Sequence, residues 1–145
     1  MKRFAWVWLL AAVAPAAGAG DFRSVQENAT VLYDAPSRAS TPLFVVQRNY
    51  PLEVIVNLDA WVKVRDHAGA LSWVEKKALG EKRTLLVTDA SAPARVRAED
   101  GAPAAFVAAQ NVVLELIETA PNGWLRVRHA DGASGFVRAA QVWGE

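Results

Sequence analysis

The chain has 145 residues, no cysteine, and 16 basic against 15 acidic residues. Without cysteine it has no disulfide framework, no thiolate metal site and no cysteine nucleophile. Its balanced charge argues against a nucleic-acid partner, because proteins that bind nucleic acid concentrate a basic surplus on one face.

The N-terminal residues have the order of a secretory leader. A cationic start precedes an apolar run at residues 4–13, and small residues follow at 17–19. This order predicts a signal peptide, 1–19, that is cleaved after Ala19. The competing interpretation, an uncleaved anchor, is disfavoured because the apolar run is shorter than the ~20 residues that cross a bilayer. We therefore expect a periplasmic or secreted chain without a stable membrane anchor.

A first β unit is predicted at residues 20–83. Its clearest strand is Trp61–Arg65, where two valines alternate with Trp, Lys and Arg as they do in a half-buried strand. Residues 52–57 alternate in the same way and predict another strand. The residues expected on its apolar face are Leu52, Val54 and Val56.

A second unit, predicted at residues 84–145, repeats the first. The segment Trp124–Arg128 matches Trp61–Arg65 at a distance of 63 residues, and Leu114–Ile117 matches Leu52–Ile55 at a distance of 62. Motifs that recur at one long period indicate the same supersecondary unit built twice.

The remaining segments favour strands and a close junction. Residues 103–110 are rich in alanine, but their counterpart at 42–47 contains Leu, Phe and Val, so we predict a strand at both places. The short charged passage 80–83 predicts a tight junction between the units. About five short strands per unit, separated by turns, indicate a small β-barrel for each. Domains of ~60 residues bury only ~60% of the surface that their extended chain exposes, so we also expect the two halves to pack together.

In this order, the motifs resemble those of the bacterial SH3-like (SH3b) domains of exported proteins. In the first unit they are Val31–Ser37, Leu52–Val56, Trp61–Arg65, the 66–69 turn, Ser72–Val74 and Leu79, and in the second unit Asn122–Arg128, the 131–132 turn, Gly135–Val137 and Val142. The resemblance covers nearly all of the mature chain. It implies an all-β fold of two tandem, small, SH3-like, partly open β-barrels after the signal peptide.

The resemblance also implies recognition or targeting modules, which in many relatives serve cell-wall peptides or glycans, and it does not imply catalysis. The second unit departs from the first in having Gly135 in the place of Ser72. The residues that it carries in the places of Tyr33 and Pro36, when the units are aligned at 63 residues, are Val96 and Glu99. The first unit is therefore the better candidate for a ligand groove.

The ligand-binding residues predicted on this basis are Tyr33, Asp34, Pro36, Trp61 and Trp124. Aromatic rings offer stacking area at little entropic cost, which suits a polyproline-type peptide or a sugar face. The alternative is that these rings pack the barrels. Trp73 and Phe136 each stand next to an apolar valine, so both are expected in the core.

The basic residues of the second unit allow two interpretations, an anion site for carboxylates or acidic lipid head groups and an ordinary solvated strand face. These residues are Arg95, Arg97, Arg126, Arg128 and Arg138. His67 and His129 lie beside turns, and no metal-binding, nucleophile-elbow or phosphate-loop motif is present. We therefore expect no enzyme, no cofactor and no metal site.

The leading functional hypothesis is an exported, non-catalytic binding module that recognises a cell-envelope ligand, either peptidoglycan or an extended peptide. The alternative is an assembly protein whose barrel edge strands pair with another envelope protein. The third hypothesis, ranked below these, is an accessory component of a cell-wall hydrolase.

Overall fold

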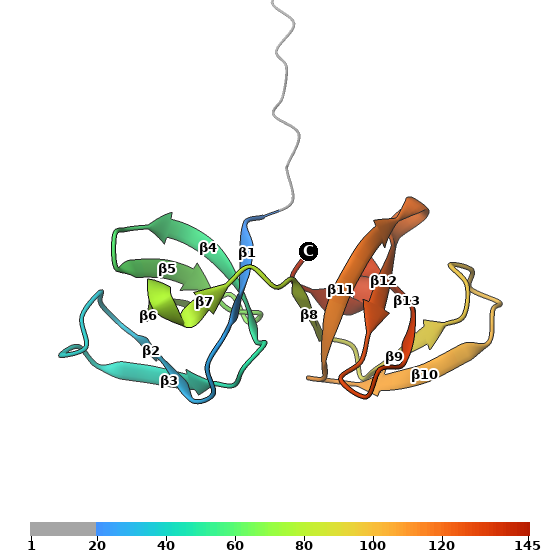
Figure 1. Cartoon of the computed structure of the whole chain (residues 1–145), viewed down its shortest axis with the longest axis horizontal. Coiled ribbons are helices and arrows are strands. Elements are labelled where there is room, and N and C mark those ends of the chain that lie inside the picture. Colours follow the sequence, from blue (N-terminus) through green and yellow to red (C-terminus); the bar gives the residue numbers. More distant parts are fainter. Residues whose placement is uncertain (1–19) are drawn as a thin grey trace, which may run out of the picture.

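The structure is a computed structural model that describes residues 20–145, and the predicted signal peptide, 1–19, lies outside the described residues. Within that range the chain forms two seven-stranded antiparallel sheets, each rolled into a small, partly open barrel (Figure 1). The prediction of an all-β fold with one barrel for each repeat is confirmed.

The first barrel contains β1 to β7 and the second contains β8 to β14. The strands of the first are β1 Phe22–Val25, β2 Thr30–Tyr33, β3 Pro42–Val46, β4 Pro51–Asn57, β5 Trp61–Arg65, β6 Leu71–Glu75 and β7 Leu79–Gly80. Those of the second are β8 Thr84–Val87, β9 Ser91–Arg95, β10 Ala104–Ala109, β11 Val113–Ala120, β12 Trp124–Arg128, β13 Ser134–Arg138 and β14 Val142–Trp143. The alanine-rich segment 103–110 is thus a strand, β10, as predicted.

Both sheets have the same strand order. The orders are β3-β2-β6-β5-β4-β1-β7 and β10-β9-β13-β12-β11-β8-β14, so β5 and β12, which begin at Trp61 and Trp124, occupy equivalent places. Short 3-10 helices lie at Lys76–Ala78, Pro121–Gly123 and Ala139–Gln141. Among residues 20–145, no helix is long and apolar enough to span a membrane.

Each barrel has its own core, filled from alternate strand positions. In β5 the predicted alternation is confirmed, because Val62 and Val64 are buried while Trp61 and Lys63 remain half-buried. The buried residues of the first core are Val25, Leu32, Leu52, Val62, Val64, Val74 and Ala78. Those of the second are Leu85, Val87, Ala92, Ala94, Ala108, Leu114, Leu125, Val127, Val137 and Val142.

A β-bulge interrupts the alternation predicted for residues 52–57. The register of β4 against β5 shifts between Val54 and Val56, and Val56 is exposed although it was expected on the apolar face. A bulge places an extra residue in one strand and so reverses the facing of the residues beyond it. The register of β11 shifts at the equivalent place, so both barrels share this feature.

The one-residue difference between the two repeat offsets arises in the connection that follows the fourth strand of each barrel. The first barrel connects β4 to β5 through residues 58–60, whereas β11 is one residue longer than β4 and a 3-10 helix leads into β12. Upstream of that point the offset is 62. The alignment of the early strands at 63 residues was therefore wrong, and Arg95 rather than Val96 stands in the place of Tyr33. The strand pairing agrees with this, because Tyr33 pairs with Trp73 and Arg95 pairs with Phe136, the residue equivalent to Trp73.

The two barrels pack against each other, as expected. The Thr84 hydroxyl donates a hydrogen bond of 2.6 Å to the Asn49 carbonyl, and the rings of Phe22 and Trp143 meet edge to face at 5.1 Å. The guanidinium of Arg83 lies 5.8 Å from the centroid of the Phe22 ring. The Phe22–Trp143 contact joins strand β1 of the first barrel to strand β14 of the second. In Figure 1, strands β1 and β8 lie at the boundary between the barrels.

Candidate functional site

Three aromatic side chains line the outer face of the first barrel. Tyr33 on β2 pairs across the sheet with Trp73 on β6, and Trp61 on β5 pairs with Glu75 on the same β6. The rings of Tyr33 and Trp61 meet edge to face, with centroids 5.6 Å apart and planes at 82°. All three rings are half-buried, so each leaves part of its surface to solvent. This surface can stack on a flat ligand.

The prediction that Trp73 and Phe136 lie in the core is wrong. In β6 the inward residues are Ser72 and Val74, both buried, and strand alternation directs Trp73 to the opposite face. Phe136 has the same relation to its neighbours in β13 and is also half-buried.

The loop from β2 to β3 adjoins the aromatic surface and is held by its own polar residues. The backbone N–H of Asp34 donates to the Thr41 carbonyl at 3.0 Å, and its carboxylate accepts from the Thr41 N–H at 2.9 Å. The Ser40 hydroxyl donates to the Ala35 carbonyl at 3.0 Å. Pro36 is exposed in this loop. Asp34 therefore closes the loop, and Pro36 is available for contact.

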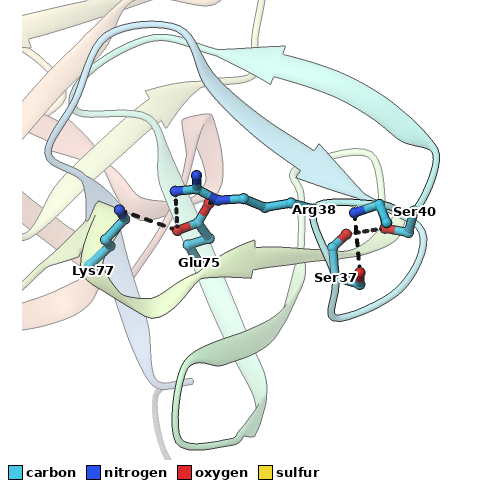
Figure 2. Close-up of polar contacts among 6 residues, drawn as sticks. Ser37, Arg38, Ser40, Glu75 and Lys77 are labelled. Atoms are coloured by element: carbon cyan, nitrogen blue, oxygen red, sulfur yellow. Dashed lines mark hydrogen bonds and ion pairs between the residues drawn. The ribbon is translucent and has the colours of Figure 1, made fainter.

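An ion pair ties the same loop to β6. Figure 2 shows Arg38 extending from the loop to Glu75, with Lys77 on the far side of the carboxylate. The guanidinium Nε and Nη2 donate to Glu75 Oε1 and Oε2 at 2.5 and 2.9 Å, and Lys77 Nζ lies 3.5 Å from Oε2. Two parallel bonds of this kind fix both position and direction. The pair holds the loop over the outer face of the barrel.

A polar depression of about 260 Å³ opens beside the ion pair. The residues that line it are Glu27, Ala29, Thr30, Val31, Tyr33, Arg38, Glu75, Lys77 and Ala78. Tyr33 belongs both to this depression and to the aromatic surface, so a ligand lying on the rings can also reach charged groups. Sequence reasoning missed these charged residues.

The second barrel carries the same ion pair with the charges exchanged. At a repeat distance of 62, Asp100 takes the place of Arg38, and at 63 Arg138 takes the place of Glu75. Arg138 Nε and Nη2 donate to the Asp100 carboxylate at 3.1 and 2.6 Å. The guanidinium carbon also lies 4.2 Å from the centroid of the Trp124 ring, and Trp124 is only 4% exposed. The exchange of a basic and an acidic residue between the two repeats is the feature of the sequence from which this ion pair could have been predicted.

Comparison with protein families assigns both barrels. The bacterial SH3 domain family matches the sequence twice, at residues 26–81 and 88–144. The chain belongs to the bacterial SH3 domain family. Each match falls on one barrel, so the resemblance predicted from the motifs is confirmed as two SH3 domains in tandem.

Solved structures that are similar to this chain include the following three proteins. NlpC2 from Trichomonas vaginalis is 11% identical, with a TM-score of 0.40 over 86% of this chain and 47% of its own. NlpC1 from the same organism is 12% identical, with a TM-score of 0.39 over 97% and 51%. An NlpC/P60 family protein from Bacillus cereus is 14% identical, with a TM-score of 0.40 over 85% and 56%. The chain therefore spans about half the length of each. Curated proteins provide no match.

The structure brings some of the predicted ligand-binding residues together and separates others. Tyr33 and Trp61 are in contact in the first SH3 domain, and Asp34 and Pro36 lie in the adjoining loop. Trp124 belongs to the second SH3 domain, where it occupies the place equivalent to Trp61 but is buried. Four of the five residues thus share one region.

The five arginines of the second SH3 domain are engaged within the domain. Their partners are Glu118 for Arg126 at 3.6 Å, Glu115 for Arg128 at 2.8 Å, Asp100 for Arg138 at 2.6 Å, Glu99 for Arg97 at 3.6 Å, and the Ala102 carbonyl for Arg95 at 2.8 Å. This arrangement matches the paired, solvated strand face rather than an anion site.

The two histidines make local contacts beside turns. His67 shares a hydrogen bond with the Tyr50 hydroxyl, and His129 lies 3.1 Å from the Asp131 carboxylate. Burial raises the pKa of Tyr50, although a hydrogen bond with the His67 backbone opposes that shift. Within residues 20–145, no three His, Asp or Glu side chains gather as a metal site would require.

The ion pairs predict a pH dependence of stability. The hydrogen bond from Arg38 lowers the pKa of the Glu75 carboxyl, and the bond from Arg138 lowers the pKa of Asp100 in the same way. A carboxyl whose pKa is lowered by folding stabilises the fold above its ordinary pKa, and that contribution is lost as pH falls through the lowered value. Glu75→Gln is therefore expected to melt slightly below the unmodified protein at neutral pH and together with it in strong acid. The neutral-pH difference is small because the pair is exposed.

Calorimetric melting curves of both proteins across this pH range measure the effect. A difference in melting temperature that stays constant from neutral to strongly acidic pH would show that the ion pair is not its source.

Proposed function

We propose that the chain is an exported, non-catalytic binding module that recognises peptidoglycan or an extended peptide through its first SH3 domain. The proposed site is the Tyr33–Trp61 surface with Pro36 beside it, and Asp34 holds the loop in place. Bacterial SH3 domains are typically associated with the cell envelope and commonly bind peptidoglycan, which supports this ligand class. The observation that carries the proposal is the half-buried Tyr33–Trp61 pair, of which Tyr33 also lines the 260 Å³ depression.

The chemistry of the surface fits a polymer that has both flat and charged parts. The rings of Tyr33 and Trp61 offer stacking area to a sugar face or a proline ring. Next to them, the largely exposed Lys77 offers a cation to a carboxylate, while Arg38 and Glu75 are bound to each other. Cell-wall glycans linked to short peptides present all of these groups.

The non-catalytic part of the proposal rests on what the two domains are. Both matched segments are SH3 domains rather than catalytic domains. The purified protein is therefore expected to leave a peptidoglycan zymogram uncleared. Clearing that survives full purification would favour the accessory hydrolase instead.

Trp61→Ala is expected to weaken binding to purified cell-wall sacculi by an order of magnitude or more. An aromatic side chain at the centre of a binding surface typically contributes about 2 kcal/mol or more when it is truncated. Co-sedimentation with sacculi, or with beads bearing a proline-rich peptide, measures the loss, and circular dichroism checks that the variant is folded.

Phe44→Ala is the matched control for Trp61→Ala. Phe44 is an exposed aromatic residue of the same domain, 48% accessible on β3, and it lies outside the proposed site. It is expected to bind sacculi like the unmodified protein. Equal binding by folded Trp61→Ala and the unmodified protein would rule out the proposed site.

A second candidate function, assembly with another envelope protein, is favoured by the edge strand β3. Leu43, Phe44 and Val45 are 42%, 48% and 60% exposed, and no charged residue occurs from 39 to 47. Proteins usually protect a sheet edge with charges or bulges. If this function operates, Phe44→Ala loses a stoichiometric partner in envelope extracts while Trp61→Ala retains it.

A further inference from the structure

The two SH3 domains differ at the residue that stands across the sheet from the leading tryptophan. In the first domain Trp61 pairs with Glu75, and in the second Trp124 pairs with Arg138. Directly paired residues on antiparallel strands have neighbouring side chains on the same face. The residue at this position therefore decides what lies against the tryptophan ring.

Arg138 is fixed over the ring by three kinds of contact. Its Nε and Nη2 donate to the Asp100 carboxylate at 3.1 and 2.6 Å. Its Nη1 donates to the Asn122 carbonyl at 3.2 Å. Its guanidinium carbon lies 4.2 Å from the centroid of the Trp124 ring, within the range of a cation–π interaction. A planar guanidinium that is held on both sides cannot move off the ring without breaking these bonds.

In the first domain, Glu75 rather than a cation stands across the sheet from Trp61, and the ring stays half-buried. A carboxylate has no favourable interaction with the negative face of an aromatic ring, and Glu75 is bound instead to Arg38 and Lys77. Trp61 packs edge to face on Tyr33 and stays half-buried. The second domain has Arg95 in the place of Tyr33, bonded to the Ala102 carbonyl.

We propose that Arg138 covers Trp124 and closes, in the second SH3 domain, the aromatic surface that is open in the first. Exposure of the tryptophan then depends on whether the loop or the strand carries the arginine of the ion pair. In the first domain the loop carries it, as Arg38, and the tryptophan is open; in the second the strand carries it, as Arg138, and the tryptophan is covered. The chain consequently presents one ligand site on its two domains. The proposal that Arg138 covers Trp124 rests on the geometry alone, whereas the number of ligand sites rests on the function proposed above.

Exchanging the charges of the second pair tests the cover. The double variant Asp100→Arg, Arg138→Glu recreates the arrangement of the first domain. Indole N–H signals of the tryptophans are followed by NMR with a soluble paramagnetic probe, after assignment through single Trp→Phe variants. In the unmodified protein, relaxation enhancement is expected to be lower at Trp124 than at Trp61. In the double variant, the enhancement at Trp124 is expected to rise to the level of Trp61.

Two further variants keep this test decisive. Arg138→Met keeps the length of the side chain and removes its charge and hydrogen bonds, so it is also expected to raise the enhancement at Trp124, and it decides the matter if the double variant does not fold. Arg126→Met removes an exposed arginine from the adjacent strand β12 and is expected to change nothing at Trp124. An enhancement at Trp124 that stays unchanged in folded Arg138→Met would overturn the cover.

Titration with soluble peptidoglycan fragments separates the two claims. The unmodified protein is expected to respond at Trp61 alone, and the double variant at both Trp61 and Trp124. If neither protein responds to these fragments or to a proline-rich peptide, the proposed function fails, while the relaxation data still decide whether Arg138 covers Trp124. A response of the unmodified protein at Trp124 equal to that at Trp61 would overturn the proposal that the chain has one ligand site on its two domains.

Discussion

Leu52→Ala is expected to lower the free energy of unfolding by about 2–5 kcal/mol, the typical loss for a large-to-small change in a core. Leu52 has no exposed surface and lies in the first core with Leu32 and Val64. Small domains have little stability to lose, so the first SH3 domain is expected to be largely unfolded in this variant. Urea denaturation followed by circular dichroism measures the change.

Leu58→Ala is the control for this prediction. Leu58 carries the same side chain on the first domain but is 44% exposed, so its truncation is expected to change stability little. Leu114→Ala removes the equivalent core residue of the second domain and is expected to affect that domain instead. A loss from Leu52→Ala no greater than that from Leu58→Ala would contradict the described core.

Gly135→Val is expected to be the most damaging single change in β13. A Cβ atom at this position would lie 2.9 Å from the Ala94 Cβ and 3.0 Å from the Ala94 carbonyl carbon and the Arg95 carbonyl oxygen. These atoms belong to β9, mostly to its backbone, and they cannot yield as a flexible side chain would. Overpacking of this kind typically costs about 1–3 kcal/mol, occasionally more. Thermal and urea unfolding of the purified variant measure the loss.

The first domain has no glycine at the position equivalent to Gly135. It has Leu32 and Ser72 where the second domain has Ala94 and Gly135, so the second domain carries the smaller residue at both positions. Gly101→Ala is the control, because a Cβ at Gly101 meets no atom within 4 Å. If Gly135→Val proves no less stable than Gly101→Ala, the close approach of β9 and β13 is wrong.

The repeated strand Trp61–Arg65 shows how far local pattern predicts this fold. A period of two has one structural solution, so the burial of Val62 and Val64 followed from the sequence. The same rule applied to Ser72–Val74 would have turned Trp73 outward. Its placement in the core relied on the apolar neighbour Val74 instead of on the alternation, which is why that prediction failed.

Features that depend on a partner strand were beyond prediction from local pattern. The bulge at Val54–Val56 is a property of the register between β4 and β5, and residues 52–57 look regular without it. The burial of Trp124 depends on Arg138, which lies on a different strand and is fixed by Asp100 on a loop. The tryptophans are equivalent in sequence but not in exposure, because the residues that cover them differ.

Only part of the candidate site was predicted, because the rest depends on contacts between segments that are distant in the sequence. Tyr33 and Trp61 were chosen for their chemistry and do meet in the structure, although 28 positions separate them along the chain. Arg38 and Glu75 were missed because charged surface residues are usually solvated, and a repeat offset of 63 hid the correspondence between Arg38 and Asp100. The exchange of charge between the domains becomes visible only at the correct offset.

Mapping the bound surface by NMR tests the central claim most directly. Soluble peptidoglycan fragments and a proline-rich peptide are titrated separately into the isotope-labelled protein, and backbone and indole signals are followed. With at least one of these ligands, we predict shifts concentrated at Tyr33, Trp61 and the 34–41 loop of the first SH3 domain, with the second domain unchanged. Unchanged signals at these residues with both ligands, or shifts centred on the edge strand β3, would contradict the proposed binding site.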